Sequence, residues 1–259
     1  MSGEEKPNKI SQQEQKDETS TKNWYASWFD SPYYHILYKD RDYAEARLFM
    51  DNITSYLNLP DNAKILDLAC GKGRHSVYLN QLGFEVTGAD LSENSIAEAS
   101  KYANEKLHFV VHDMREPFDQ KFDAVFNLFT SFGYFENEHD NIRVLKAIRD
   151  SLDEFGFGVI DFMNATRVIK NLVPEEIKTV EGIDFHLKRY CIDNYIYKEI
   201  DFDDKGEHYH FVEKVKAFTV ADFESMMEES GIYLLDIFGD YKLKTYSKND
   251  SERLILIFK

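Results

Sequence analysis

The sequence contains 259 residues, with 31 Lys and Arg against 47 Asp and Glu, and its formal net charge at pH 7 is −16. This acidity argues against partners that need a broad basic face, such as nucleic acid or an anionic membrane. The chain is long enough to bury a core without disulfides, and its two cysteines are typical of a reducing compartment. No apolar run approaches the roughly 18 residues of a membrane span, and the first residues are too polar for a signal peptide. We therefore expect a cytoplasmic enzyme or ligand-binding protein.

The first part of the chain divides into a polar and an aromatic segment. Residues 1–22 contain almost no apolar side chains, so we expect a disordered tail. An aromatic-rich stretch follows, and an amphipathic pattern from about Tyr43 to Leu57 predicts a helix that ends before Pro60. We interpret residues 23–60 as a helical cap on a single domain that spans residues 23–259.

From Ala63 onward, short apolar segments alternate with amphipathic ones. This order is typical of an α/β fold, a doubly wound and mostly parallel sheet with helices on both faces. Strands are predicted at 64–70, 84–90, 107–111, 122–129, 156–163, 232–238 and 252–258, and helices at about 74–82, 92–105, 139–152 and 221–230.

A different pattern interrupts this alternation near residue 177. Apolar and polar residues alternate from about Ile177 to Phe218 without a helical period, which predicts three or four antiparallel strands. Asp204, Lys205 and Gly206 form a predicted hairpin turn. We interpret residues 175–218 as a small antiparallel β insert that acts as a lid.

A glycine loop follows the first predicted strand, in the sequence ILDLACGKGRHS. Gly71 and Gly73 allow the backbone to turn sharply and to approach a ligand closely. Asp90 ends the second predicted strand, where a carboxylate can accept hydrogen bonds from both hydroxyls of a ribose. Together these residues predict an adenosine-type ligand with a free 2′-hydroxyl group.

The acid within the first strand narrows the choice of ligand. Asp67 precedes Gly71 by four residues; its charge would repel a diphosphate but would attract the ammonium and sulfonium groups of S-adenosylmethionine. After the third strand, Asp113 can accept a hydrogen bond from an adenine amino group, and Met114 can lie against the ring.

These motifs together resemble the class I S-adenosylmethionine-dependent methyltransferases. The four motifs are ILDLACGKG, VTGADLS, HDMRE and FDAVFNLFTSFGYF, and they occur in order between about Ala63 and Met163. The resemblance implies a Rossmann-like, seven-stranded sheet whose last strand is antiparallel. The LACGKGRHS and SFGYF segments are similar to small-molecule methyltransferases with an antiparallel lid after the fifth strand, such as those acting on amino sugars.

The resemblance also implies roles around the methionyl part of the cofactor. Gly71 and Gly73 would pass beneath it, and Asp67 would hold the loop and attract the ammonium group, directly or through water. Asn127 would offer its backbone carbonyl near the methionyl amine. Tyr38, which precedes the sequence KDRDYAEA, would cover the cofactor from the N-terminal side.

The adenosine part is assigned to the second and third motifs. Asp90 would bind the ribose, with Leu91 beside the adenine. Asp113 and Met114 would bind the adenine itself.

The acceptor side is less determined, and no residue is predicted as catalytic. Phe132 and Tyr134 follow the fourth strand, which places them near the transferred methyl group as candidate substrate contacts. A hydroxyl acceptor would need a base, for which His35 and His186 are candidates.

The predicted function is methyl transfer from S-adenosylmethionine to nitrogen or oxygen of a small molecule by in-line displacement. No metal is predicted, because His208 and His210 share a strand face without a third ligand at a fixed spacing. A noncatalytic cofactor-binding module is an alternative, and so is an NAD-dependent oxidoreductase, against which Asp67 and the missing third glycine argue. The acidity, and NLFT in place of an N/D-P-P-Y/F motif, disfavour nucleic acid. The acceptor molecule and the oligomeric state are left open.

Overall fold

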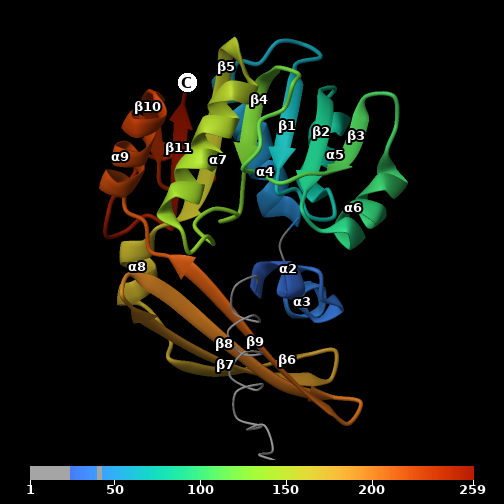
Figure 1. The fold of residues 1–259 in the computed structure, drawn as a ribbon, viewed down its shortest axis with the longest axis vertical. Helices are drawn as coiled ribbons and strands as arrows, with labels where there is room; N and C mark the ends of the chain where they lie inside the picture. The colour runs from blue at the N-terminus through green and yellow to red at the C-terminus, as the bar shows by residue number, and fades with distance from the viewer. Residues whose placement is uncertain (1–23, 40–42) are drawn as a thin grey trace, which may run out of the picture.

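The computed structural model describes residues 24–39 and 43–259, so the tail expected at 1–22 lies outside the described part of the chain. Figure 1 shows two β-sheets, one above the other in this view, with the helices α2 and α3 between them. In the described residues, no helix is both long and apolar enough to cross a membrane.

The larger sheet has seven strands in the order β10-β11-β5-β4-β1-β2-β3. Strands β1 to β5 are parallel where they pair, whereas β11 is antiparallel to both β5 and β10. The predicted fold class, with its antiparallel last strand, is confirmed. The strand bounds are β1 Lys64–Leu68, β2 Glu85–Asp90, β3 Leu107–Val111, β4 Phe122–Asn127, β5 Leu152–Met163, β10 Leu234–Phe238 and β11 Arg253–Phe258.

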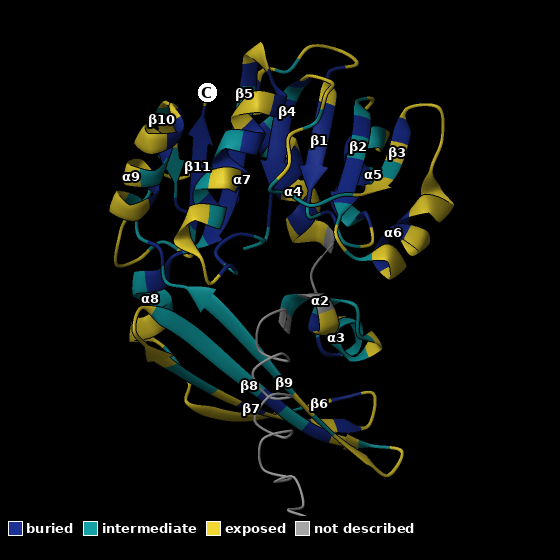
Figure 2. Cartoon of the chain, in the orientation of Figure 1, coloured by how far each residue is buried: buried dark blue, intermediate teal, exposed yellow. Residues whose placement is uncertain are grey.

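Both faces of this sheet are covered and buried. Successive residues of a strand point to opposite faces, so each strand contributes side chains to two cores. In β1, Ile65 packs into one hydrophobic core and Leu66 into the other. Helices α4 (Tyr43–Leu57) and α5 (Arg74–Gln81) cover the first face, and α7 (Glu138–Ser151) and α9 (Val220–Ser230) cover the second. Figure 2 accordingly shows the central strands β1, β4 and β11 mostly in the colour of buried residues, whereas the edge strands β3 and β10 are partly exposed.

The order of the strands fixes where a ligand can bind. β1 lies between β4 and β2, so the chain leaves β1 toward one side of the sheet and later returns on the other. At such a switch point the loops after neighbouring strands diverge and leave a crevice at the carboxyl ends of the strands.

The smaller sheet is antiparallel and has the order β6-β7-β8-β9; we call it the lid sheet. Its hairpin between β8 and β9 turns at Lys205 and Gly206, both with positive φ, as a two-residue hairpin with matching twist requires. A short helix, α8, which the sequence did not predict, connects β5 to this sheet. The bounds are α8 Ala165–Lys170, β6 Glu175–Val180, β7 Ile183–Ile192, β8 Tyr195–Asp204 and β9 Glu207–Lys216.

The N-terminal segment, residues 24–39, packs on the lid sheet. It contains α2 (Trp24–Phe29) and α3 (Pro32–Leu37), and α3 begins with Pro at its first position after Ser31, whose side chain accepts a hydrogen bond from the Tyr33 amide. Trp28 and Leu37 are buried with apolar side chains of the lid sheet in a third core cluster. The aromatic residues of this segment therefore belong largely to a core.

One predicted helix is shorter than expected. Ser92 caps α6 by accepting from the Ser95 amide, but α6 covers only Glu93–Ala99. One 3₁₀ turn, η1, continues it over Ser100–Tyr102 before the chain bends toward β3. The polar run that suggested a longer helix is part of this connection.

Candidate active site

A cavity of about 1020 Å³ opens between the carboxyl ends of the large sheet and the lid sheet, next to the N-terminal segment. Of the predicted site residues, seven line it: Tyr38, Gly71, Asp90, Leu91, Asp113, Met114 and Tyr134. The others, Asp67, Gly73, Asn127 and Phe132, are not part of its lining. The motifs of three successive strands and part of the N-terminal segment thus meet at one place.

The two loop glycines have different physical roles. Gly71 has a φ of +55°, and a Cβ built on it would meet nothing within 4 Å, so this residue faces open space. Gly73 has a φ of +78°, and its Cβ would lie 2.6 Å from the ring of Phe109. The left-handed backbone favours glycine at both positions, but only Gly73 is also required by packing.

Asp90 closes the glycine loop. One carboxylate oxygen accepts from the amide of Gly71 at 2.8 Å, and the other accepts from the amide of Ser92 at 2.9 Å. Burial raises the pKa of this carboxyl, although the backbone hydrogen bonds oppose the shift. Asp90 therefore connects the first and second motifs, and its carboxylate lies on the cavity surface.

Asp67 lies beneath the loop, with 1% of its surface exposed. Its carboxylate accepts a hydrogen bond from the Ser76 hydroxyl at 2.6 Å. Burial raises the pKa of Asp67 to about 6, and the nearby charge of Asp90 acts in the same direction. The predicted part in holding the loop fits this position, whereas an attraction to an ammonium group would act from below the cavity surface.

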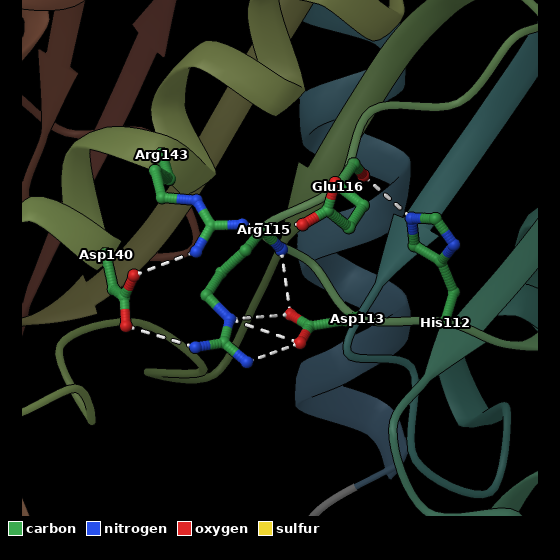
Figure 3. A network of polar contacts seen from close by, with 6 residues as sticks. All are labelled: His112, Asp113, Arg115, Glu116, Asp140 and Arg143. Carbon is green, nitrogen blue, oxygen red and sulfur yellow. Dashed lines mark hydrogen bonds and ion pairs between the residues drawn. The ribbon is translucent and has the colours of Figure 1, made fainter.

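Asp113 is engaged by a neighbour that the sequence reading did not consider. Figure 3 shows Arg115 reaching back to both oxygens of Asp113, with a shortest contact of 2.6 Å, and across to Asp140 of α7 at 3.0 Å. Burial raises the pKa of Asp113, but the hydrogen bonds and charge of Arg115 outweigh this and leave the pKa below its usual value. An adenine amino group would have to share this carboxylate with Arg115.

The same network extends to the surface of the protein. Arg143 bridges Asp140 and Glu116, and the ring of His112 contacts the backbone carbonyl of Glu116 at 2.7 Å (Figure 3). The loop after β3 is thereby attached to the start of α7.

The lid side of the cavity contains a second polar cluster. The Trp28 indole and the Tyr38 hydroxyl both donate to one oxygen of Glu213, at 2.8 and 2.7 Å. Lys198 donates to the Tyr38 oxygen at 2.6 Å, and its ammonium lies 3.9 Å from the other oxygen of Glu213. Tyr38, predicted as a cofactor cover, therefore belongs to the lid side of the cavity.

The chain matches known proteins over most of its length. Residues 65–156 match the family model described as a methyltransferase domain. The chain is 29% identical over 217 residues to a protein of Bacillus subtilis (strain 168) named as a methyltransferase, YqeM, covering 76% of this chain and 84% of that protein. It is 26% identical over 202 residues to the glycine/sarcosine N-methyltransferase of Halorhodospira halochloris, covering 74% and 73%.

A solved structure has the same fold. It is an S-adenosylmethionine-dependent methyltransferase from Clostridium acetobutylicum ATCC 824, with a TM-score of 0.73 at 22% identity, covering 88% of this chain and 95% of that chain. The chain is an S-adenosylmethionine-dependent methyltransferase whose residues 65–156 match the methyltransferase-domain family. Neither the noncatalytic module nor the NAD-dependent oxidoreductase finds support in these matches.

The methyltransferase has a cavity that fits S-adenosylmethionine. Gly71 leaves space where a side chain would stand, and Asp90 brings a carboxylate to the surface of the same loop. When bound, the cofactor supplies a methyl group on an electrophilic sulfonium. In the part of the chain that the structure describes, no group of three or more metal-ligating side chains is arranged to hold a metal ion.

Three predicted residues of the methyltransferase are absent from the cavity lining for different reasons. Phe132 is fully buried and packs against Phe218 and Phe223, so its placement gives no support to a substrate contact. Asn127 is also fully buried; its amide donates to the Leu68 carbonyl, and its side-chain oxygen has no hydrogen-bond partner among the described residues. Gly73 packs against Phe109 instead of lining the cavity.

Other cavity residues of the methyltransferase were not predicted. Asp30 of the N-terminal segment accepts from the Ser92 hydroxyl at 2.5 Å and from the Asn94 amide at 2.6 Å, beside the ribose-binding position assigned to Asp90. No short sequence motif predicts these contacts, because Asp30 precedes both Ser92 and Asn94 by more than 60 residues. Glu213 and Lys198 occupy directly opposed positions on β9 and β8, and only their register reveals the pair.

Proposed function

We propose that this methyltransferase binds S-adenosylmethionine between the glycine loop and Asp90, and methylates an amine of a small polar molecule held under the lid sheet. The observation that carries the proposal is the single cavity shared by the motif loops and the lid sheet. Its volume of about 1020 Å³ lies at the upper end of the range for small-ligand sites, which leaves room for a cofactor and an acceptor together.

An amine acceptor suits the lid side of this cavity. Glu213 brings a carboxylate to the lining, where the Lys198 ammonium 3.9 Å away offsets part of its charge, and the rings of Tyr34, Tyr38 and Tyr134 form part of the same lining. A carboxylate and aromatic faces attract an ammonium group or a cationic methyl donor. The relative from Halorhodospira halochloris, named for N-methylation of glycine and sarcosine, supports the same class of acceptor.

The chain's own residues would accelerate the reaction mainly by positioning. An amine in its neutral form needs no strong base at the moment of attack, so holding it in line with the methyl group and away from water is the principal task, worth roughly 7–11 kcal/mol. The lid sheet and the N-terminal segment would exclude water. A small-molecule acceptor, and no nucleic acid, fits a cavity of this size in a protein of charge −16.

The test begins with binding by the full chain. Isothermal calorimetry should detect S-adenosylhomocysteine, and Asp90→Ala should raise its dissociation constant by about tenfold or more, because two backbone amides and the ribose hydroxyls lose their acceptor. Unchanged affinity in Asp90→Ala would contradict the assignment of the ribose site.

Turnover is then measured with S-adenosylmethionine and a panel of glycine, sarcosine, amino sugars and matched hydroxy compounds, with S-adenosylhomocysteine detected by mass spectrometry. We expect turnover with at least one amine and slower turnover with its hydroxy counterpart. Binding without turnover of any compound would favour a noncatalytic module.

A further inference from the structure

An ion pair between the buried Asp161 and the partly exposed Arg253 lies next to the cavity and has no part in the functions assigned above. Asp161 of β5 is 0% exposed, and one of its carboxylate oxygens accepts from Nε of Arg253 on β11 at 2.7 Å. The other oxygen accepts from the hydroxyl of Tyr241 at 3.0 Å and from the amide of Phe129 at 2.9 Å. Three separate segments therefore converge on one carboxylate.

The segment held by this carboxylate is strained. Phe129 and Thr130 follow β4 and have φ values of +57° and +63°. Two consecutive left-handed residues that are not glycine are costly, and the β-branched Thr is especially unsuited to this conformation. Such a backbone persists only where the surrounding contacts fix it.

Asp161 and Arg253 supply these contacts. The Thr130 amide donates to the backbone carbonyl of Asp161 at 2.8 Å, and Nη2 of Arg253 donates to the Thr130 hydroxyl at 3.0 Å. With the Phe129 amide already bound by the Asp161 carboxylate, both residues of the turn are fixed by the same ion pair. A buried ion pair adds little net stability over an apolar pair of the same volume, so its hydrogen bonds to this turn are its distinctive contribution.

The turn itself forms part of the cavity surface. Leu128, Phe129, Thr130 and Ser131 all line the cavity. The Phe129 ring lies 5.0 Å from the ring of His75, in the first turn of α5 directly after the glycine loop. The turn thus spans from the cofactor loop toward the lid side.

The turn also orients a predicted acceptor contact. The hydroxyl of Tyr134 donates to the Thr130 carbonyl, and the Tyr134 ring lies 5.4 Å from that of Phe29 in the N-terminal segment. A change in the turn would therefore move Tyr134 as well as Phe129.

We propose that Asp161 and Arg253 are positioning residues for methyl transfer, which hold the Phe129–Thr130 turn in its left-handed conformation and thereby fix the cavity wall against which the acceptor is aligned. This inference rests on the proposed function, because it places the acceptor between the glycine loop and the lid sheet. The pair touches neither ligand; its effect is transmitted through Phe129, Thr130 and Tyr134.

Two substitutions and one control test the proposal. Asp161→Asn places an amide where three donors now converge, so at least one contact to the turn or to Arg253 is lost. Arg253→Lys keeps the positive charge, but a single ammonium replaces the fork that reaches both Asp161 and Thr130. Ile255→Val is the control: Ile255 is fully buried, pairs with Asp161 across the strands and shares a core cluster with Tyr241 and Phe129, so this change removes one methyl group beside the ion pair without removing any of its hydrogen bonds.

The first readout separates positioning from stability. With the fastest amine of the panel, we expect kcat to fall by at least tenfold in Asp161→Asn and about threefold in Arg253→Lys, while calorimetric affinity for S-adenosylhomocysteine changes less than threefold. Ile255→Val should leave both quantities within twofold of the wild type. A loss of kcat no larger than in Ile255→Val at equal folded fraction would overturn the proposal.

The second readout does not need an acceptor. Amide hydrogen exchange at Phe129 and Thr130, followed by NMR, should accelerate by at least tenfold in Asp161→Asn or Arg253→Lys and should not change in Ile255→Val. Unchanged exchange in both variants would show that the pair does not hold the turn. If the wild type methylates nothing in the panel, the proposed function fails, and the exchange experiment still decides on the turn.

Discussion

The two sides of the cavity are constructed in different ways. On the cofactor side, the decisive contacts join residues close in sequence: Asp67 to Ser76 over 9 positions, Asp113 to Arg115 over 2, and Gly71 to Asp90 over 19. On the lid side, Trp28, Tyr38 and Lys198 are joined to their partners over 160 to 185 positions. Contacts between residues close in sequence can be recognised as a short sequence motif. Contacts between distant residues leave no such motif, and the surface that they form can vary with the acceptor.

The largest expected effect tests whether the cofactor side depends on backbone geometry. Gly73→Ala should lower the free energy of unfolding by about 4 kcal/mol, because a left-handed alanine is strained and its Cβ would overlap the Phe109 ring. Urea unfolding measures the change.

Gly71→Ala is the matched variant for this experiment. It carries the same left-handed strain without the overlap, so about 1 kcal/mol is expected from the strain alone. Its added methyl faces the cavity, so the loss should appear in cofactor affinity. Equal unfolding losses in the two variants would contradict the distinction between a packing glycine and a cavity glycine.

The next effect concerns the buried acid of the same side. Asp67 has its pKa raised from the usual 3.8 to about 6, so the fold favours its protonated form. The resulting stabilisation is fully present below pH 3.8 and is lost as pH rises through about 6, which amounts to about 3 kcal/mol by pH 7. The difference in unfolding free energy between wild type and Asp67→Asn, measured from pH 4 to pH 7, should follow this curve. If the difference in unfolding free energy does not change with pH, the pKa of Asp67 is not raised in the folded protein.

On the lid side we expect a smaller effect that is confined to the acceptor. Glu213→Gln preserves an oxygen for Trp28 and Tyr38 but removes the charge that balances Lys198, whose ammonium would then repel a cationic amine, so the acceptor KM should rise about tenfold. Calorimetric affinity for S-adenosylhomocysteine should stay within twofold. Glu207→Gln, at the exposed end of β9, is the control. A parallel loss of cofactor affinity would mean that the two sides are not separate.

The smallest effect is expected where the two sides meet. Asp30→Ala removes the hydrogen bonds to Ser92 and Asn94, so S-adenosylhomocysteine should dissociate about threefold faster in stopped-flow measurements. Asp236→Ala, which removes a hydrogen bond from Tyr56 outside the cavity lining, should leave the rate unchanged. No acceleration in Asp30→Ala would show that this contact does not restrain the cofactor.

The sequence predicted the large sheet well, because strands and turns are signalled by residues that are close together in the chain. Alternating apolar segments fixed strands such as β1, and the hairpin at Lys205 and Gly206 was signalled by its turn residues. The glycine loop and Asp90 could be recognised in the sequence because a sharp backbone bend requires glycine and because the Asp90 carboxylate binds a backbone amide of that same loop.

Other features could not be predicted, because they depend on packing between distant segments. Phe132 looked like a substrate contact from its position after β4, but the turn at Phe129 and Thr130 directs it into the core. That turn is imposed by Asp161 and Arg253, whose proximity arises from the register of β5 and β11. The ion pair between Asp113 and Arg115 could have been predicted from the sequence, since the two residues are only two positions apart.

The attachment of Trp28 and Tyr38 to Glu213 has a consequence for the order of events during synthesis. While the ribosome is still translating β1 to β5, the N-terminal segment has left the exit tunnel without the strands on which it packs. Only after β9 has emerged can these aromatic residues find their partners, so the acceptor chamber is among the last parts of the enzyme to be completed.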